Sequence, residues 1–435
     1  MKVLIAALNT ERFPDPVYPL GADYVAFSVL RAGYEVQTFD AMLADDPAKE
    51  LSELIATYRP DVIGLSIRNV DNTNYLNFKS YTSYYWGIVQ SCRSVSNAII
   101  VLGGSAFAVF PNEYMETLLA DYGIVGEGEY AFINLLQSIE KGTLPFEKVI
   151  YSQRIKKIDF NYFTDRHLFD NEYYYTFSGS INIQTKRGCA FKCSYCTYPK
   201  IEGVQYRYRS PQNVVDEIEF WFKKGYQYFF FVDSVFNQPE KYAESICKEI
   251  IKRKIDIRWT GFFMPKIKNE RFVKLCKESG LTSMDFGTDA LSKETIQAYQ
   301  KSFTLDEVFQ SCEWCRKYDI KFNHSLILGG PGETFDTLEE TIGNVNRTMP
   351  VSVIAYLGVR LFPGTPIASS FSQEELSLKP HFFISEDIKN GVYDFLKEKL
   401  GNDPRWIIPG LMDKNPKFME KLRIKGKKGP LWELI

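Results

Sequence analysis

The chain contains the stretch Thr185–Lys–Arg–Gly–Cys–Ala–Phe–Lys–Cys–Ser–Tyr–Cys–Thr197, whose three cysteines have the spacing CxxxCxxC. These are Cys189, Cys193 and Cys196, and they follow an apolar, strand-like run at residues 181–185. Three thiolates in one short loop can bind three irons of a four-iron cluster, which leaves the fourth iron without a protein ligand. A metal centre with an open position is reactive, whereas a closed one is structural. The stretch therefore predicts a reactive iron–sulfur centre at the end of a strand.

Zinc is the alternative for this triplet. A zinc ribbon needs a fourth ligand from a second CxxC or from histidines at a set spacing. The three histidines, His167, His324 and His381, are isolated in sequence. Cys312 and Cys315 lie in a distant helical pattern, where they share one face and are expected in the core. We therefore favour the cluster over a zinc knuckle or a chance grouping.

Composition bounds the remaining possibilities. A chain of 435 residues is expected to form two or three domains. Its net charge is 52 − 54 = −2, which argues against non-specific electrostatic binding of nucleic acid. We see no signal peptide and no apolar run long enough to span a membrane. We therefore expect a cytoplasmic protein whose eight cysteines are reduced.

Residues 1–145 alternate strand and helix patterns. Strands that are apolar nearly throughout and separated by helices indicate a parallel sheet covered on both faces. The five expected strands are Lys2–Leu8, Val36–Phe39, Val62–Ile67, Ile99–Leu102 and Tyr122–Val125. This pattern predicts an α/β, doubly wound, flavodoxin-like (Rossmann-type) domain, in which ligands bind beyond the carboxyl ends of the strands.

Polar residues and glycines follow four of these strands. Glycines let a large ligand approach the backbone, and Asn, Ser and Thr offer hydrogen bonds to amide groups. We expect these residues to form a ligand site at one edge of the sheet, and the candidates are Asn9, Thr10, Arg68, Asn69, Gly103, Gly104, Ser105, Gly126, Glu127 and Gly128.

The rest of the chain divides into three parts. Residues 146–179 are expected to be a linker, and residues 180–369 alternate again. The strands expected there are Ile181–Thr185, Tyr228–Val232, Ile257–Phe263, Ser283–Gly287, Phe322–Leu328 and Ser352–Val359. Residues 370–435 are expected to form a small, mostly helical unit that covers the substrate site. Its main helix is predicted over 385–400, with Ser385 as N-cap.

The run Gly188–Cys–Ala–Phe–Lys–Cys–Ser–Tyr–Cys196 resembles the signature of the radical S-adenosylmethionine (SAM) family, which has an aromatic residue before its last cysteine. The resemblance implies a partial (β/α)6 barrel, a 4Fe-4S cluster and bound SAM. The family's pattern at the strand ends also implies SAM-binding roles for Tyr195, Asp233, Gly287, Asp289 and Gly330. The glycines that normally accompany the carboxylate at Asp233 are absent here.

Residues 1–145 resemble the cobalamin-binding domain of cobalamin-dependent radical SAM enzymes. Three segments carry this resemblance: 66–69, 101–105 and 121–129. Residues 1–166 contain no histidine, so the cobalt cannot take a lower histidine ligand from this domain. If cobalamin binds, it is expected in the base-off form without a histidine ligand. Arg68 points either toward the lower cobalt face or to the rim of the pocket.

The combined resemblance implies a methyltransferase. Its acceptor would be an unactivated carbon or phosphorus centre of a small-molecule, lipid or peptide intermediate, attacked through a 5′-deoxyadenosyl radical and methylcobalamin. An electron donor such as flavodoxin or ferredoxin would reduce the cluster. Two alternatives stay open, and the residues themselves do not identify a catalytic acid or base. One is a non-methylating rearrangement or cyclisation with the same cofactors, and the other is a non-enzymatic cobalamin sensor.

Overall fold

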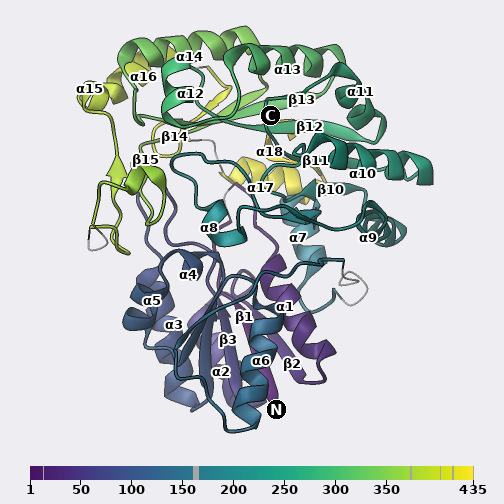
Figure 1. The fold of residues 1–435 in the computed structure, drawn as a ribbon, viewed down its shortest axis with the longest axis vertical. Coiled ribbons are helices and arrows are strands. Elements are labelled where there is room, and N and C mark those ends of the chain that lie inside the picture. Colours follow the sequence, from purple (N-terminus) through teal and green to yellow (C-terminus); the bar gives the residue numbers. More distant parts are fainter. Residues whose placement is uncertain (13, 160–165, 373–374, 402, 414–415, 435) are drawn as a thin grey trace.

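The computed structural model describes the chain except for residues 13, 160–165, 373–374, 402, 414–415 and 435. Two α/β domains are stacked on each other, and the short helix α8 (Tyr198–Glu202) lies between them (Figure 1). The N-terminus belongs to one domain, and the C-terminus lies against the other. The site that the cysteines define is therefore at the junction of the two domains.

The first domain is built on a parallel sheet of six strands in the order β2-β1-β3-β4-β5-β6. Its strands are β1 (Lys2–Ala7), β2 (Glu35–Asp40), β3 (Val62–Ser66), β4 (Ile99–Gly103), β5 (Tyr122–Val125) and β6 (Val149–Tyr151). The predicted flavodoxin-like domain and its five strands are confirmed. The sixth strand was not predicted, and it lies in the segment that we expected to be a linker.

Helices cover both faces of this sheet. One face packs against α1 (Leu20–Arg31) and α6 (Gly128–Glu140), and the other packs against α2 (Pro47–Tyr58), α3 (Thr82–Val95), α4 (Ser105–Val109) and α5 (Pro111–Leu118). Successive side chains of a strand point to opposite faces, so β1 contributes Val3 and Ile5 to one core and Leu4 and Ala6 to the other.

Local chemistry sets where helices begin in this domain. Helix α2 begins after Asp46, whose carboxylate accepts a hydrogen bond from the backbone N–H of Lys49 at 3.2 Å. Pro47 follows at the first helical position, where its missing N–H costs nothing. The helix ends at Arg59, which adopts a left-handed conformation.

The second domain is built on a curved parallel sheet in the order β17-β14-β13-β12-β11-β10-β7. Its strands are β7 (Ile181–Ile183), β10 (Tyr228–Phe231), β11 (Arg258–Phe263), β12 (Leu281–Asp289), β13 (Lys321–Leu328), β14 (Ser352–Leu357) and β17 (Trp406–Ile407). The six predicted strands are confirmed as the partial barrel. The two-residue strand β17 comes from the C-terminal unit and adds to its edge.

Helices pack outside the barrel strands (Figure 1). They are α9 (Pro211–Lys223), α10 (Glu240–Arg253), α11 (Glu270–Glu278), α12 (Lys293–Ala298), α13 (Leu305–Lys317) and α14 (Phe335–Thr348). Cys312 and Cys315 on α13 are buried in this core, as their spacing predicts. Helix α13 begins with a capping box in which Thr304 and Glu307 each satisfy a backbone N–H of the other.

Small elements connect these layers. Helix α7 (Asn171–Ser178) leads into the barrel, and β8 (Lys186–Arg187) pairs with β9 (Arg207–Tyr208) as an antiparallel ladder around the cysteine loop. Beyond β14, β15 (Val359–Arg360) pairs with β16 (Phe382–Phe383). A 3-10 turn at Pro366–Ala368 follows β15.

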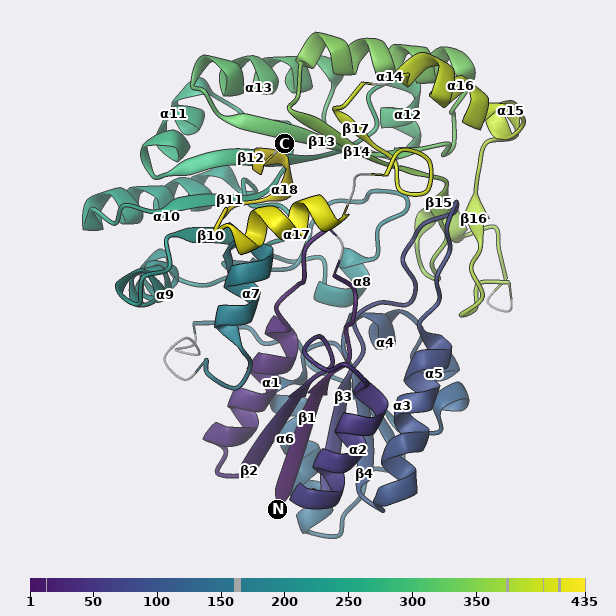
Figure 2. The same cartoon turned by 180° about the vertical axis from the view of Figure 1, so that it is seen from behind.

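The C-terminal unit differs from its prediction in two ways. The helix expected over 385–400 is divided into α15 (Glu386–Lys389) and α16 (Val392–Leu400), because Gly391 takes a positive φ of 101°. Ser385 precedes α15 without a side-chain capping bond. The unit also does not stay at one end of the barrel: α17 (Pro416–Ile424) packs on α7, as Figure 2 shows, and α18 (Leu431–Leu434) lies against the amino ends of β10 and β12.

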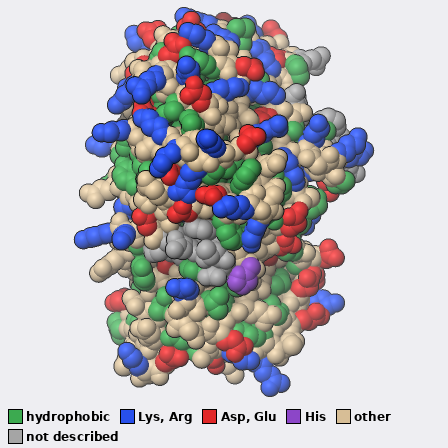
Figure 3. All heavy atoms as spheres, turned by 90° about the vertical axis from the view of Figure 1, so that its right-hand side faces the viewer, with side chains coloured by type: hydrophobic (Ala, Val, Ile, Leu, Met, Phe, Trp, Pro, Cys, Tyr) green, Lys and Arg blue, Asp and Glu red, His purple; other side chains and the backbone are tan. Residues whose placement is uncertain are grey.

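The surface agrees with the near-neutral charge. On the face that Figure 3 shows, basic and acidic side chains are interspersed over both domains. Within the part of the chain that the structure describes, no helix has both the length and the apolar character that crossing a bilayer requires.

Candidate functional site

The loop at residues 188–197, which we call the cluster loop, joins β8 to α8 between the two domains. Gly188 opens it at a φ of +97°, and a Cβ there would lie 2.2 Å from the carbonyl oxygen of Gln205. The backbone N–H of Gly188 donates to Glu202 at 3.0 Å, and that of Cys189 donates to the carbonyl of Gly203 at 3.0 Å. The start of the loop is thus fixed against the end of α8, and only glycine fits there.

The three predicted cluster ligands lie together in this loop. Cys189 is buried, whereas Cys193 and Cys196 are half-buried. Burial raises the pKa of the Cys193 thiol and raises that of Cys196 to about 12, and the neighbouring thiols add to both shifts. Metal binding must therefore remove protons from these thiols.

Two predicted SAM-binding residues meet beside the loop. The phenol of Tyr195 donates to the carboxylate of Asp289, which lies at the end of β12 with a positive φ of 59°. The ammonium of Lys301 bonds to the same carboxylate, to Tyr195 Oη at 3.3 Å and to the carbonyl of Gly287 at 3.1 Å. Burial alone would lower the pKa of Lys301, but Asp289 and the Cys193 thiol raise it. The structure thus brings Tyr195, Gly287 and Asp289 together, as expected.

Lys301 was not foreseen, because nothing in its local sequence distinguishes it from a surface lysine. Gly330 lies elsewhere, under Tyr299. A Cβ at Gly330 would lie 2.1 Å from Tyr299 Oη, which donates to the carbonyl of Ile327 at 2.8 Å. Packing therefore requires glycine at this position, and a SAM contact by its backbone stays a prediction.

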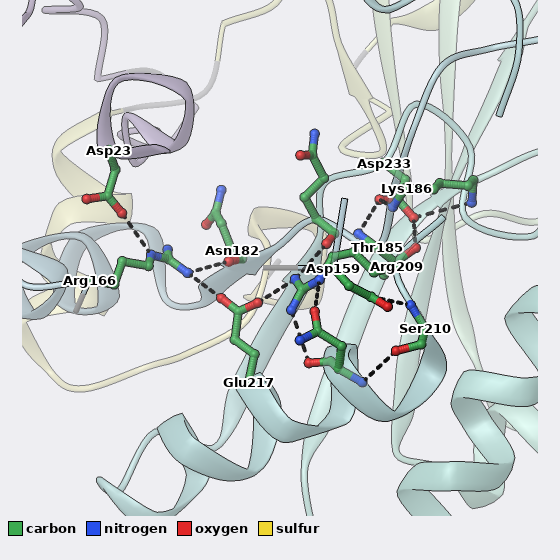
Figure 4. A network of polar contacts seen from close by, with 12 residues as sticks. Asp23, Asp159, Arg166, Asn182, Thr185, Lys186, Arg209, Ser210, Glu217 and Asp233 are labelled. Carbon is green, nitrogen blue, oxygen red and sulfur yellow. Dashed lines mark hydrogen bonds and ion pairs between the residues drawn. The ribbon is translucent and has the colours of Figure 1, made fainter. Parts of the chain in front are cut away.

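The geometry does not favour a SAM contact for Asp233. Its side chain has no exposed surface, and its oxygens accept from the N–H of Thr185 at 2.7 Å, the hydroxyl of Thr185 at 2.5 Å and the ammonium of Lys186 at 3.3 Å. These donors all lie within the barrel (Figure 4). Asp233 therefore fixes the strand that leads to the cluster loop, and other groups are needed for the methionine ammonium.

A cavity of about 360 Å³ lies beyond the carboxyl ends of the first sheet. Eight of the ten residues predicted to bind cobalamin line it: Asn9, Arg68, Gly103, Gly104, Ser105, Gly126, Glu127 and Gly128. Thr10 and Asn69 do not line the cavity, although the Asn69 amide donates to Asn9 Oδ1 at 3.0 Å. The opposite wall comes from the barrel and α8, through Asn182, Gln184, Val232, Ile201 and Glu202. The two domains therefore share one cavity.

The cavity suits a large amide-bearing ligand. The Nδ2 atom of Asn9 is buried and has no hydrogen-bond partner among the described residues. A buried amide of this kind calls for an acceptor from a ligand. At Gly104 the φ is +98° and a Cβ would lie 2.4 Å from the carbonyl oxygen of Ile67, so the backbone itself forms the wall. The residues present therefore fit cobalamin.

Residues of the first sheet and of the helices α1 and α6 also line the cavity. The apolar residues among them include Ile5, Val25, Gly64, Val101 and Phe132. A Cβ at Gly64 would lie 2.8 Å from the side chain of Ile5 and 3.1 Å from that of Phe132, so a side chain at this position would narrow the cavity.

Arg68 lines the cavity, where it is partly covered and partly open to solvent. Its Nη1 donates to Asn69 Oδ1 at 3.1 Å, and its carbonyl accepts from the hydroxyl of Ser105 at 2.7 Å. Burial within the cavity lowers the pKa of this guanidinium. The loops after β3 and β4 thus hold each other, and Arg68 is a candidate contact for the lower face of a bound corrin.

Glu127 has partners that sequence reasoning did not find. Its carboxylate forms ion pairs with Arg207 and with Arg187 at 3.4 Å, and it accepts from the N–H of Ile155 at 2.8 Å. Glu129 binds Arg187 at 2.6 Å. The segment predicted to contact cobalamin therefore also binds the barrel domain directly beside the cluster loop.

Two family models match the chain. The model for the radical SAM superfamily matches residues 183–345, and the model for the B12 binding domain matches residues 8–136. Both matches fall on the domains described above. The chain is therefore a cobalamin-dependent radical SAM enzyme, the class that its fold and its three-cysteine loop define, and the predictions of class and cofactors are confirmed.

Individual relatives refine this assignment. The chain is 21% identical to the tryptophan 2-C-methyltransferase of Streptomyces laurentii, over 86% of this chain and 75% of that protein. It is 26% identical to the anaerobic magnesium-protoporphyrin IX monomethyl ester cyclase of Rubrivivax gelatinosus, over 74% of this chain and 61% of that protein. The structure of the radical SAM methyltransferase TsrM from Kitasatospora setae, with cobalamin and a [4Fe-4S] cluster bound, superposes with a TM-score of 0.87. It covers 99% of this chain and 96% of TsrM at 21% identity.

Proposed function

We propose that the chain is a radical SAM methyltransferase that methylates an unactivated carbon or phosphorus centre of a small-molecule intermediate. The observation that carries this proposal is the shared cavity, whose walls come from the cobalamin-binding sheet edge, the barrel and the helix after the cluster loop. A methyl donor and a radical initiator that act on one substrate must be held over one space. When bound, cobalamin carries the methyl group, and the cluster with SAM supplies radical chemistry.

The chain's own residues bind, orient and exclude water. The start of the cluster loop is anchored by the bond from Gly188 to Glu202, and Glu202 itself lines the cavity. Asp289, held by Tyr195 and Lys301, places a fixed negative charge beside the loop. It can accept from the ribose or the ammonium of SAM in place of Asp233, whose oxygens have partners within the protein. Apolar walls around the rest of the cavity exclude water.

A rearrangement or cyclisation is the second candidate, favoured by the likeness to the cyclase. The likeness to the tryptophan methyltransferase and to the structure of TsrM supports methyl transfer. An external one-electron donor, such as flavodoxin or ferredoxin, would reduce the cluster in either case.

The test uses the reconstituted enzyme, SAM with a deuterated methyl group, dithionite and a small-molecule extract of the source cells. Methyl transfer predicts labelled cobalamin, a product with three added deuterons, and S-adenosylhomocysteine together with 5′-deoxyadenosine. An unlabelled product formed with 5′-deoxyadenosine alone would support the rearrangement. Labelled product without 5′-deoxyadenosine would indicate polar methylation, and absence of any SAM cleavage would support a sensor.

A further inference from the structure

Arg187 joins the two halves of the site. It lies two residues before Cys189, and its side chain reaches into the other domain. Its Nη2 binds Glu129 at 2.6 Å and its Nη1 binds Glu127 at 3.4 Å. The exposed fraction of each of these side chains is 8% or less, so the pairs are buried. The two glutamates flank Gly128, and all three of these residues line the shared cavity, as Arg187 does.

The guanidinium of Arg187 is held from several directions. Its Nε donates to Gln184 Oε1 at 2.9 Å, and Gln184 also lines the cavity. Its plane lies over the ring of Tyr24, with 5.4 Å between the guanidinium carbon and the ring centroid. In the ladder of β8 and β9 its partner is Arg207, which binds the same Glu127. Because each nitrogen of this planar guanidinium has a partner, the group is fixed in one orientation. A lysine has a single ammonium and cannot make the same set of contacts.

The residues just before Arg187 are held by the barrel itself. Asp233 binds Thr185 and Lys186, and Arg209 donates to the carbonyl of Gln184 at 2.9 Å and to Glu217 at 2.6 Å (Figure 4). The segment that enters the cluster loop is therefore bound to the barrel at three successive residues and to the cobalamin-binding domain at the next one. Arg187 is the point where the two sets of contacts meet.

Precise spacing between the two domains matters for the proposed reaction. Each domain has its own hydrophobic core, and side chains of the barrel domain such as Ile201 and Phe362 also pack against the core of the first domain. A displacement of about 1 Å can cost a reaction on the order of 100-fold in rate. Contacts between the domains must therefore set the distance, and those of Arg187 are next to both cofactor sites.

We propose that Arg187, through Glu127 and Glu129, is a positioning residue that sets the distance between the cobalamin cavity and the cluster loop. This inference rests on the proposed function, because methyl transfer is the step that needs the distance. Arg187 also lines the cavity, but in this role it acts through the backbone that leads to Cys189.

The test compares Arg187→Lys and Glu129→Gln with Arg423→Lys. Arg423 is the control, because its buried side chain pairs with the half-buried Asp15 of the cobalamin-binding domain at 3.0 Å, outside the cavity lining. Each protein is reconstituted with iron, sulfide and hydroxocobalamin, and the cofactors are then reduced. The magnetic coupling between cob(II)alamin and the reduced cluster reports their distance without any substrate. The ratio of methylated cobalamin to 5′-deoxyadenosine reports how efficiently methyl transfer to cobalamin proceeds relative to radical cleavage of SAM.

We expect Arg187→Lys and Glu129→Gln to load both cofactors but to change the magnetic coupling, and to lower the ratio about 10-fold. Arg423→Lys should match the wild type in both readouts. Unchanged coupling and ratio in both test variants would overturn the proposal. Failure of both to load cofactors, while Arg423→Lys loads, would overturn it in favour of a purely structural role. If the wild type labels no product, the proposed function fails, but the magnetic measurement still decides the role of Arg187.

Discussion

The guanidinium of Arg360 donates to the carboxylate of Asp71 at 2.9 Å, across 289 residues of sequence. Both side chains are buried, with exposed fractions of 3% and 0%. Asp71 belongs to the loop after β3 that carries Arg68, and Arg360 ends β15 beyond the last long barrel strand. The pair therefore ties the loop of the cobalamin-binding domain to the mouth of the barrel.

Removing the charge of Asp71 should destabilise the protein. Asp71→Asn leaves the buried guanidinium of Arg360 without its counter-charge, which typically costs about 3 kcal/mol. Urea denaturation should show this loss in the free energy of unfolding. The control is Glu35→Gln, which breaks an exposed pair with Lys2 and should cost less than about 1 kcal/mol. Equal effects of the two substitutions would contradict the assignment of the pair as a buried tie.

The cluster should depend on Cys193 and not on the core cysteines. Anaerobic reconstitution of the wild type is expected to give about four irons per chain. Cys193→Ala should abolish SAM cleavage and lower the iron content. Cys312→Ala removes an equally reduced cysteine from the core around α13, so it should keep its iron and its SAM cleavage. Persistent formation of 5′-deoxyadenosine by Cys193→Ala would show that the thiolate assignment is wrong.

Cobalamin binding should depend on Gly104. A side chain there would meet the carbonyl of Ile67 at 2.4 Å, so Gly104→Ala must displace the cavity wall and should abolish cobalamin binding. Gly142→Ala is the control, because Gly142 also has a positive φ, of +67°, but a Cβ there meets nothing within 4 Å. It should cost about 1 kcal/mol and leave binding unchanged. Binding is measured from the absorbance of the retained cofactor, and full retention by Gly104→Ala would refute this placement.

The bound cofactor should also lack a histidine ligand. The electron paramagnetic resonance spectrum of cob(II)alamin on the enzyme should be of the base-off type, without nitrogen splitting from a lower ligand. Residues 1–166 contain no histidine, and the residue that reaches the cavity from the loop after β3 is Arg68. A clear nitrogen triplet in that spectrum would contradict the prediction.

Local patterns were enough to predict both sheets. Runs such as Val62–Ile67 are apolar nearly throughout, and their short length and β-branched residues distinguish them from helices. The strands β6 and β17 were missed because they are short and gain their partners only from the folded sheet. A two-residue or three-residue strand has no period that a sequence can display.

Side-chain pairing between distant segments was the part that the sequence could not supply. The thiols, Tyr195 and Asp289 were found because they follow a motif or a strand end. Lys301 and Arg187 were missed because their partners lie in other elements and no local pattern connects them. Asp233 was chosen for its place after a strand, but its internal donors decide its role.

The acid sensitivity of the fold should depend on His324, which is buried and does not act as a base in the cavity. Its Nδ1 meets Thr288 Oγ1 at 3.2 Å and its Nε2 meets Thr348 Oγ1 at 3.1 Å. Burial lowers the pKa of this imidazole from 6.5 to about 3. Below pH 6.5 the unfolded chain therefore binds a proton that the folded chain refuses, and the free energy of unfolding falls as the pH falls.

Above pH 6.5 the neutral imidazole of His324 does not lower the free energy of unfolding. Below pH 6.5 the free energy of unfolding falls by up to about 1.4 kcal/mol per pH unit, until the pH approaches the pKa of His324 in the folded protein. His324→Gln cannot take up this proton, so its stability should fall less steeply than that of the wild type between pH 6.5 and 4. His381→Gln serves as the control, because that side chain is exposed and meets solvent both before and after unfolding. Urea denaturation at several pH values measures the slopes. Equal slopes for the wild type and His324→Gln would show that the imidazole is protonated in the folded protein.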